Sequence, residues 1–234
     1  METSPQRPIR TPFDLPIDAS AAPPPAGRRQ RKRNQTLDHL AATAFDLFEA
    51  HGYEAVTMEQ IAAQADVAKG TLYNHFPVKE ALLAHQFHGE LAAGLQQLRG
   101  ALEGLGSFQA RLCYLLSASA DWCEARRGYL PHYLRFRFLD LGPGRFEQGD
   151  GEGAPGRSGM DLAFDALMAA GQQSSELRRD LPSGQLATLF HHLYLGALMR
   201  WLAAPAGDLR AEFAAIVDLF FHGAARAAEP ERAR

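Results

Sequence analysis

The segment from Met58 to Pro77 constrains the fold of this chain more than any other stretch of the sequence. Its apolar spacing predicts two short helices joined by a turn at residues 66–68, with Val67 filling the space between them. The positions that should face inward are Ile61, Ala62 and Ala65 on the first helix and Leu72 and Phe76 on the second. Two short helices around a tight turn form a helix-turn-helix unit, whose second helix can enter the major groove of DNA.

Local signals support both ends of this unit. Thr57 precedes the first helix and Gln60 follows three residues later, which is the spacing of a capping box that satisfies free amides at a helix start. Asp66 stands where such turns often have glycine, and aspartate tolerates a positive φ. Pro77 ends the second helix and suits the first turn of the next one.

The outward side of the second helix is dense in hydrogen-bonding groups. Its residues are Lys69, Gly70, Thr71, Tyr73, Asn74 and His75. Ammonium, hydroxyl, phenol, amide and imidazole groups can contact phosphates and base edges, and a glycine lets the backbone approach them closely. The alternative is a helical hairpin inside an ordinary all-α core, which would not need such a polar face.

Residues 34–82 resemble the DNA-binding domain of the TetR family of bacterial transcriptional regulators. The positions that carry the resemblance are Ala44, Leu47, Phe48, Gly52, Tyr53, Thr57, Met58, Ile61, Ala62, Ala65, Val67, Lys69, Gly70, Thr71, Leu72, Tyr73, His75, Phe76, Lys79, Glu80 and Leu82. Two positions depart from the family pattern, because Asp66 replaces the usual turn glycine and Ala68 replaces a common serine. That serine would cap the second helix, so we expect one cap or polar contact to be missing.

The resemblance implies an all-α chain of about nine helices. Residues 34–82 would form an N-terminal three-helix helix-turn-helix domain, and residues 83–226 a C-terminal helical domain for effector binding and dimerisation. The implied function is sequence-specific transcription regulation by a homodimeric repressor, which a small-molecule effector releases from its double-stranded DNA operator. The residues expected to contact DNA are Arg33, Thr57, Lys69, Gly70, Thr71, Tyr73, Asn74, His75 and Lys79.

The net charge of the whole chain does not indicate a nucleic-acid partner, since it is formally −3 at pH 7. The basic character is local, because residues 28–33 carry five positive charges in six positions. Residues 1–33 are rich in proline and poor in large apolar side chains, so we expect a disordered arm with a basic end. The arm would follow the DNA backbone or enter the minor groove; the alternative is a solvated linker with incidental charge. Residues 227–234 should form a short tail.

The composition is that of a soluble globular protein, and we expect a cytoplasmic location. Hydrophobic residues make up 46% of the chain and charged residues 22%. The N-terminus lacks the apolar run of a signal peptide, and no stretch is long enough to span a membrane. Cys113 and Cys123 would lie about 15 Å apart on one helix, too far to pair with each other, and such cysteine usage suits a reducing compartment.

The rest of the chain also has helical spacing. The expected helices are 34–51, 78–99, two pieces within 107–141 broken near Gly128 and Pro131, 160–173, 182–203, and a last helix from the cap Asp208 to about 225. Residues 142–159 are glycine-rich and predict a flexible loop. Residues 151–156 match G-x-G-x-x-G, but no strand precedes them and no helix opens within them, so we reject a dinucleotide site.

Aromatic residues after Trp122 are candidates for an effector pocket, because aromatic walls with a few polar groups are typical of small-molecule sites. The candidates are Trp122, Tyr129, His132, Tyr133, Phe136, Phe164 and Met168. The alternative is that these side chains simply fill a helical core. The effector itself should be partly apolar or aromatic.

The last two helices have apolar stripes that predict a dimer interface. The residues of these stripes are Leu186, Phe190, Leu193, Ala197, Trp201, Phe213, Ile216, Val217 and Phe220. In TetR-family proteins, helices of this kind from two subunits form a four-helix bundle.

Signals for metal binding or catalysis are weak. His85 and His88, and the adjacent pair His191 and His192, lack a further ligand at metal-site spacing. No nucleophile and base occur with a local catalytic signature. We therefore expect no metal, no cofactor and no enzymatic activity. The rivals to an effector-controlled repressor are a ligand-independent regulator of the same fold and an all-α enzyme with a helix-turn-helix-like hairpin.

Overall fold

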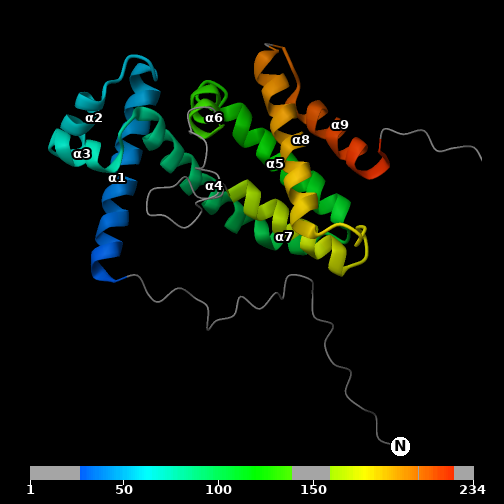
Figure 1. The fold of residues 1–234 in the computed structure, drawn as a ribbon. Coiled ribbons are helices and arrows are strands. Elements are labelled where there is room, and N and C mark those ends of the chain that lie inside the picture. Colours follow the sequence, from blue (N-terminus) through cyan, green and yellow to red (C-terminus); the bar gives the residue numbers. More distant parts are fainter. Residues whose placement is uncertain (1–26, 139–158, 205, 224–234) are drawn as a thin grey trace, which may run out of the picture.

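The computed structural model describes residues 27–138, 159–204 and 206–223 (Figure 1). Within these ranges the regular structure is entirely helical, as the sequence predicts. The nine helices are α1 (Arg28–His51), α2 (Met58–Gln64), α3 (Lys69–His75), α4 (Lys79–Glu103), α5 (Phe108–Ala125), α6 (Leu130–Phe138), α7 (Gly159–Gln173), α8 (Ser183–Ala203) and α9 (Leu209–His222). None of these helices is both long enough and apolar enough to cross a bilayer.

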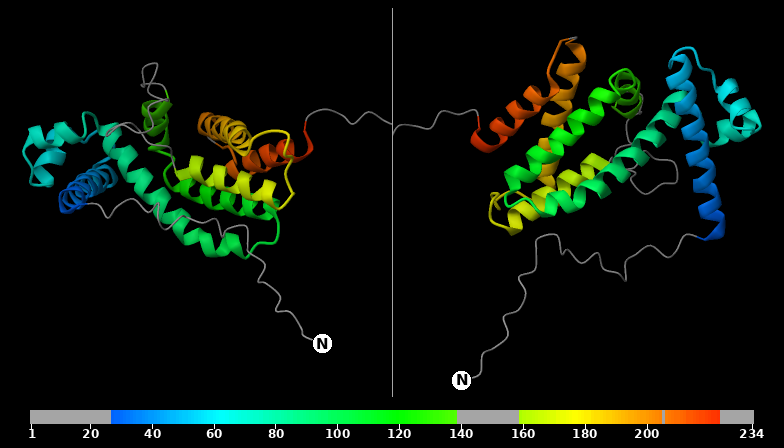
Figure 2. Two further views of the ribbon diagram at one scale, coloured as in Figure 1. Left: turned by 60° about the horizontal axis from the view of Figure 1, so that its bottom comes forward. Right: turned by 180° about the vertical axis from the view of Figure 1, so that it is seen from behind.

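Helix α4 connects two groups of helices (Figure 1). The first group is α1, α2 and α3, in which α2 contacts both neighbours and α1 also packs on α4. In the second group, α4 contacts α5, α6 and α7, while α7 packs on α8, α8 on α9, and α9 on α5 (Figure 2). The expected domain boundary at residue 82 falls inside α4, so one continuous helix belongs to both groups.

Side-chain caps set several helix starts where the sequence places them. Thr57 Oγ1 accepts a bond from the Gln60 amide at 3.2 Å, and Gln60 Oε1 accepts one from the Thr57 amide at 2.8 Å, which confirms the capping box. Asp208 caps α9 by accepting from two backbone amides of its first turn. Ser107 caps α5 through the amide of Ala110 at 3.2 Å. Each cap satisfies an amide that would otherwise lack a partner within its helix.

Helix α1 begins at Arg28 rather than at Asn34. The prediction of a disordered basic arm ending at residue 33 is therefore wrong for residues 28–33, which form the first turns of this helix. The physical reason is that arginine and lysine are favourable helix residues, and extending an existing helix adds a hydrogen bond without a second nucleation step. Residues 1–26 and the expected tail at 227–234 lie outside the described residues.

The remaining elements follow the sequence closely. The break between α5 and α6 covers residues 126–129, where Gly128 predicts it. Cys113 and Cys123 both lie on α5, and both are free thiols. The expected loop at 142–159 lies outside the described residues except for Gly159, which begins α7, and the rejected match at 151–156 lies outside them altogether.

Buried side chains form one core that runs through both groups of helices. Its fully buried members include Leu40, Phe48, Ile61 and Leu72 in the first group and Phe108, Phe164, Phe190 and Trp201 in the second. Phe87 of α4 connects the two parts, because its ring centroid lies 6.2 Å from that of Phe45 on α1 and 4.9 Å from that of Trp122 on α5. Close-packed contacts of this kind can carry a displacement from one group to the other.

Candidate DNA-binding interface and ligand pocket

The outward face of α3 is open to solvent. Lys69, Gly70, Thr71, Tyr73 and Asn74 are exposed, as the sequence predicts, whereas His75 is half-buried. Leu72 and Phe76, on the opposite side, expose 0% and 5% of their surfaces and anchor the helix to the core. The phenol of Tyr73 exposes 43% of its surface beside the polar groups of the same face. The face therefore combines the donors and acceptors that contact phosphates and base edges.

The turn before α3 has the geometry expected for Asp66 and Ala68, the two residues that depart from the TetR-family pattern. Asp66 adopts a φ of 53°, in the left-handed region that aspartate tolerates better than most residues. Val67 is half-buried and packs against the core between the helices. Ala68 is the N-cap of α3 and supplies no side-chain bond to it, so the cap that a serine would provide is absent.

Glu59 of α2 is a site residue that the sequence analysis missed. Its Oε1 accepts a bond from Tyr73 Oη at 3.4 Å and lies 3.7 Å from Lys69 Nζ. Partial desolvation and the Glu59 carboxylate raise the pKa of Tyr73, and its phenol, like an ordinary tyrosine, is protonated and able to donate at neutral pH. The carboxylate thus engages two of the groups expected to contact DNA. The available signal was its position in the first turn of α2, two residues after the capping threonine.

Lys79, at the start of α4, is held by Tyr53 at the beginning of the α1–α2 connection. Its Nζ donates to the backbone carbonyl of Tyr53 at 2.8 Å and lies 4.5 Å from the centroid of the Tyr53 ring. An ammonium has three donors, so a phosphate can share it with this carbonyl. Thr57 is exposed at the N-cap of α2, and Arg33 is exposed on α1.

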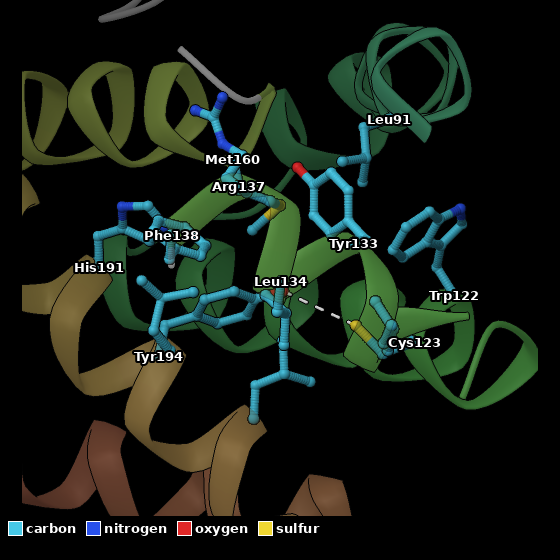
Figure 3. A pocket seen from close by; sticks show the side chains of 13 residues that line it. Leu91, Trp122, Cys123, Tyr133, Leu134, Arg137, Phe138, Met160, His191 and Tyr194 are labelled. Atoms are coloured by element: carbon cyan, nitrogen blue, oxygen red, sulfur yellow. Dashed lines mark hydrogen bonds between the residues drawn. The ribbon is translucent and has the colours of Figure 1, made fainter. Parts of the chain in front are cut away.

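A pocket lies inside the second group of helices (Figure 3). Its lining residues are Leu91, Trp122, Cys123, Leu130, Tyr133, Leu134, Arg137, Phe138, Met160, His191, Tyr194, Leu195 and Leu198. Leu91, Trp122 and Tyr133 gather on one side, and Phe138, His191 and Tyr194 on the other (Figure 3). The empty space is about 410 Å³ including its opening to solvent, but only about 30 Å³ of it can hold the centre of a water molecule. The pocket is therefore narrow in this state.

The pocket includes two of the seven residues that the sequence nominates for it, Trp122 and Tyr133. Of the other five, Tyr129 contacts Phe45 of α1, His132 contacts Tyr53 just after α1, Phe164 and Met168 are fully buried in the core, and Phe136 packs half-buried against it. A role of these five in effector binding stays a prediction. Aromatic residues fill cores and line pockets alike, so residue type alone cannot separate the two environments. Cys123, Arg137, His191 and Tyr194 were not nominated, and they come together only through the packing of α5, α6 and α8.

Charged groups form one side of the pocket wall. Arg137 Nη2 lies 3.5 Å from Asp161 Oδ2, and His191 Nδ1 contacts the other oxygen of the same carboxylate. Arg137 is 8% exposed, so its charge sits in a largely dry environment where ionic contacts are stronger than in water. Three ionisable groups on α6, α7 and α8 thus meet at one point beside an otherwise apolar cavity.

Hydroxyl and thiol groups form a second polar cluster between α5 and α8. Tyr194 Oη lies 2.8 Å from Ser119 Oγ and 3.8 Å from Cys123 Sγ. Burial raises the pKa of the Cys123 thiol to about 11 and that of Tyr194 well above its usual value. Both groups are neutral at physiological pH, so they can form hydrogen bonds with a ligand but Cys123 is a poor nucleophile.

The histidines of α4 take part in pairwise contacts. His88 Nε2 lies 3.1 Å from Tyr133 Oη, and His85 Nε2 lies 2.8 Å from Asp38 Oδ1. Burial, followed by the charges of Arg137 and His85, lowers the pKa of His88 to about 4. Across the part of the chain that the structure describes, no three His, Cys, Asp or Glu side chains converge as a metal site would require.

Most of the predicted dimer residues are buried within one subunit, so these side chains have little surface left to contact a partner. Those already buried are Leu186, Phe190, Ala197, Trp201, Phe213 and Val217, while Leu193, Ile216 and Phe220 are half-buried. Their periodicity marks the side of α8 and α9 that packs on α5, α7 and each other. The outer side of α8 carries different residues, including Leu189 at 50% and Met199 at 49% exposure, and α9 adds Leu219 at 40%. We call this outer side the α8–α9 outer face.

Comparisons with known proteins agree with this arrangement. The model of the family described as "Bacterial regulatory proteins, tetR family" matches residues 40–85. The transcriptional repressor KstR of Mycobacterium tuberculosis is 34% identical over 205 residues, which cover 87% of this chain and 86% of KstR. The putative mycofactocin biosynthesis regulator MftR of the same organism is 33% identical over 84 residues, but that match spans only 36% of this chain and 40% of MftR.

Solved structures share the fold. The TetR-family repressor FadR of Thermus thermophilus, determined in complex with lauroyl-CoA, superposes with a TM-score of 0.64. Its sequence is 23% identical, and the match covers 85% of this chain and all of the FadR chain. The helix-turn-helix geometry, the family match and the near full-length similarity to KstR lead to one conclusion: this chain belongs to the TetR family of bacterial regulatory proteins and is a transcriptional regulator, not an enzyme.

Proposed function

We propose that the chain is a homodimeric repressor that inserts α3 into the major groove of its operator and leaves the DNA when a small molecule occupies the pocket. The observation that carries this proposal is the exposed polar face of α3, held outward by the buried Leu72 and Phe76. The half-sites of a dimer would lie about one helical turn apart, near 34–36 Å, or further if the two domains splay.

The DNA contacts divide by chemistry. Thr71, Tyr73 and Asn74 are proposed to contact bases or sugars, because hydroxyl and amide groups read base edges. Thr57, Tyr73, His75 and Lys79 would bind phosphates, and Gly70 would let the backbone come close. Arg33, with the other basic residues at the start of α1, would meet the phosphates beside the half-site. In these terms residues 34–82 are the DNA-binding domain and residues 83–226 the regulatory and dimerisation domain.

The pocket favours an effector with an apolar body and a polar group. Its walls are mainly leucine and aromatic side chains, while Arg137, His191 and Tyr194 offer polar contacts. A ligand shifts an equilibrium only by the difference between its affinities for the two states. In this proposal the narrow, closed state binds DNA and the ligand stabilises a wider one. A cytoplasmic location is part of the same proposal.

The first experiment identifies the operator by selecting bound sequences from random DNA and measures affinity by fluorescence anisotropy. Tyr73→Ala and Lys79→Ala should each weaken binding, and Lys79→Ala should also reduce the slope of log affinity against log salt by up to about one. Tyr114→Ala, which removes an exposed tyrosine from α5, is the matched control and should bind as the unmodified chain does. If Tyr73→Ala and Lys79→Ala both leave the affinity and its salt dependence unchanged, the assignment of these residues as DNA contacts is wrong.

The narrow pocket supports a second candidate function, a transcriptional regulator of the same fold whose DNA binding does not respond to a ligand. A thermal-shift screen of small amphipathic compounds against the full chain separates the two. Under the repressor proposal, a compound that raises the melting temperature also weakens operator binding at the same concentration. Stabilising compounds that leave operator affinity unchanged would favour the ligand-independent regulator.

A further inference from the structure

Helix α6 lines the pocket on one side and contacts the first group of helices on another. Leu130, Tyr133, Leu134, Arg137 and Phe138 line the pocket. His132, on the same short helix, turns away from the pocket and reaches the first group of helices, where it meets the segment after α1. A nine-residue helix of this kind moves as one body, so a displacement on its pocket side must also appear at His132.

His132 meets Tyr53, which is 7% exposed. The two rings are stacked, with centroids 4.1 Å apart and planes inclined by 28°. His132 Nε2 also lies 3.6 Å from Oε1 of Glu54, the residue after Tyr53, so Glu54 also holds the imidazole in place. Tyr129, just before α6, makes an edge contact with Tyr53, with the two ring centroids 6.5 Å apart. The ring of Tyr53 is therefore contacted by His132 and Tyr129 of the regulatory domain and also by Phe48 of α1, whose ring centroid lies 4.9 Å away.

Tyr53 in turn holds Lys79. Its carbonyl accepts a bond from Lys79 Nζ at 2.8 Å, and the ammonium lies 4.5 Å from the centroid of the same ring. Both contacts fix the direction of a long side chain that otherwise has several free rotamers. The position of the Lys79 ammonium thus depends on where Tyr53 lies.

We propose that His132 and Tyr53 are positioning residues that transmit the state of the pocket to Lys79, alongside the route through α4. This inference rests on the proposed function, because it takes Lys79 to be a phosphate contact. In the closed state the stack keeps Tyr53 in place and Lys79 directed at the DNA. When α6 moves, the stack loosens and the ammonium loses its fixed orientation. The α4 route runs separately, through the contact of His88 with Tyr133.

A double-mutant cycle on operator affinity tests the link from His132 to Lys79. His132→Ala should weaken binding by roughly three- to tenfold, the range expected for residues that modulate coupling without touching the ligand. The same substitution in a Lys79→Ala background should have almost no effect, because its target is gone. His132→Phe, which keeps a ring over Tyr53 but loses the contact with Glu54, should restore most of the affinity. Tyr114→Ala again serves as the control.

A second cycle tests the pocket side of the link. Leu134 lines the pocket and is 8% exposed, so Leu134→Trp acts as a fixed occupant that displaces α6. It should weaken operator binding in the unmodified chain and do so less in the His132→Ala background. Far-ultraviolet circular dichroism and melting curves of every variant show that the compared proteins are folded; if Leu134→Trp fails to fold, Leu134→Phe takes its place.

The outcomes separate the inference from the function on which it rests. If the unmodified chain selects no DNA sequence, the proposed function fails. If it binds an operator but His132→Ala leaves affinity unchanged, or weakens it equally with and without Lys79, the positioning role is overturned while the repressor stands. Failure of His132→Phe to rescue would also overturn it, because the stacked ring would then not be the feature that matters.

Discussion

At the scale of single residues, Glu59 places a negative charge among the groups that would meet DNA. Its carboxylate is close to Tyr73 Oη and to Lys69 Nζ. Any phosphate that approaches these groups must compete with it, and this competition is the same for every DNA sequence. Glu59 therefore lowers the affinity for all DNA by about the same factor and leaves the ratio of specific to non-specific binding unchanged.

Glu59→Gln should raise the affinity for random-sequence DNA by roughly two- to fivefold, as expected from removing one exposed charge contact. Affinity for the operator should rise by a similar factor, so the ratio of specific to non-specific binding should stay the same. Anisotropy titrations with operator and scrambled duplexes at matched salt measure both. Glu103→Gln removes the same charge at the far end of α4 and should change neither; equal effects of the two substitutions would assign the change to net charge alone (Figure 1).

His88 offers a prediction about pH. Burial lowers its pKa to about 4 from 6.5, so the folded chain binds its proton less readily than the unfolded chain does. The stability that depends on neutral His88 is present above about 6.5 and is lost as the pH falls toward 4. Each pKa unit corresponds to about 1.4 kcal/mol, so the effect amounts to a few kcal/mol at most.

The free energy of unfolding in urea, measured at pH 7 and pH 5 for the unmodified chain and for His88→Gln, checks this expectation. The unmodified chain should lose more stability between the two pH values than the variant does. His39→Gln, at an exposed position on α1, should behave like the unmodified chain. A pH dependence that is the same in His88→Gln would show that other groups carry it.

At the scale of helices, the sequence predicted existence and type well because the signals are local. Apolar spacing and caps such as Thr57 and Asp208 act over a few residues, and their geometry in the structure matches. The start of α1 was missed because a run of positive charge suits both a solvated arm and an exposed helix. Helix propensity, with a preformed helix to extend, decided between them.

The contents of the site were harder to predict, since they depend on which helices meet. Phe164 and Met168 are as apolar as pocket residues but lie in the core, while Arg137 and His191 reach the pocket from helices far apart in sequence. The α3 face could be predicted because one short helix supplies it. The pocket could not, because periodicity reports which side of a helix is buried and not what it is buried against.

Gly171 gives a test of one such helix contact, where α7 lies against α5. A β-carbon at this position would come within 2.7 Å of Phe108 Cδ2 and 2.8 Å of Leu177 Cδ1. Gly171→Ala should therefore destabilise the chain by roughly 1–3 kcal/mol through overpacking. Gly94 on α4 has open space around it, and Gly94→Ala should stabilise by about 0.5–1 kcal/mol because alanine is the better helix residue. Urea unfolding measures both, and a stabilised Gly171→Ala variant would contradict the tight contact.

At the scale of the whole molecule, the question is which surface meets a second copy. Most residues of the apolar stripes that the sequence predicted to form the dimer interface pack inside the subunit; Phe190 and Trp201, for example, expose 0% and 2% of their surfaces. The α8–α9 outer face is what remains available to a partner. On it, Leu189, His192, Gly196 and Met199 follow a helical spacing of three and four, and the exposed glycine would let a second helix approach closely.

If this face forms the dimer, Leu189→Glu combined with Met199→Glu should turn a dimer into a monomer, since two carboxylates from each subunit would be buried without partners. Size-exclusion chromatography with light scattering on the full chain gives the mass directly. Operator affinity should fall with the loss of the dimer, because a monomer reaches only one half-site. Leu162→Glu places the same charge at an exposed leucine of α7 and should stay dimeric. A dimer that survives the double substitution but is broken by Leu162→Glu would move the interface to α7.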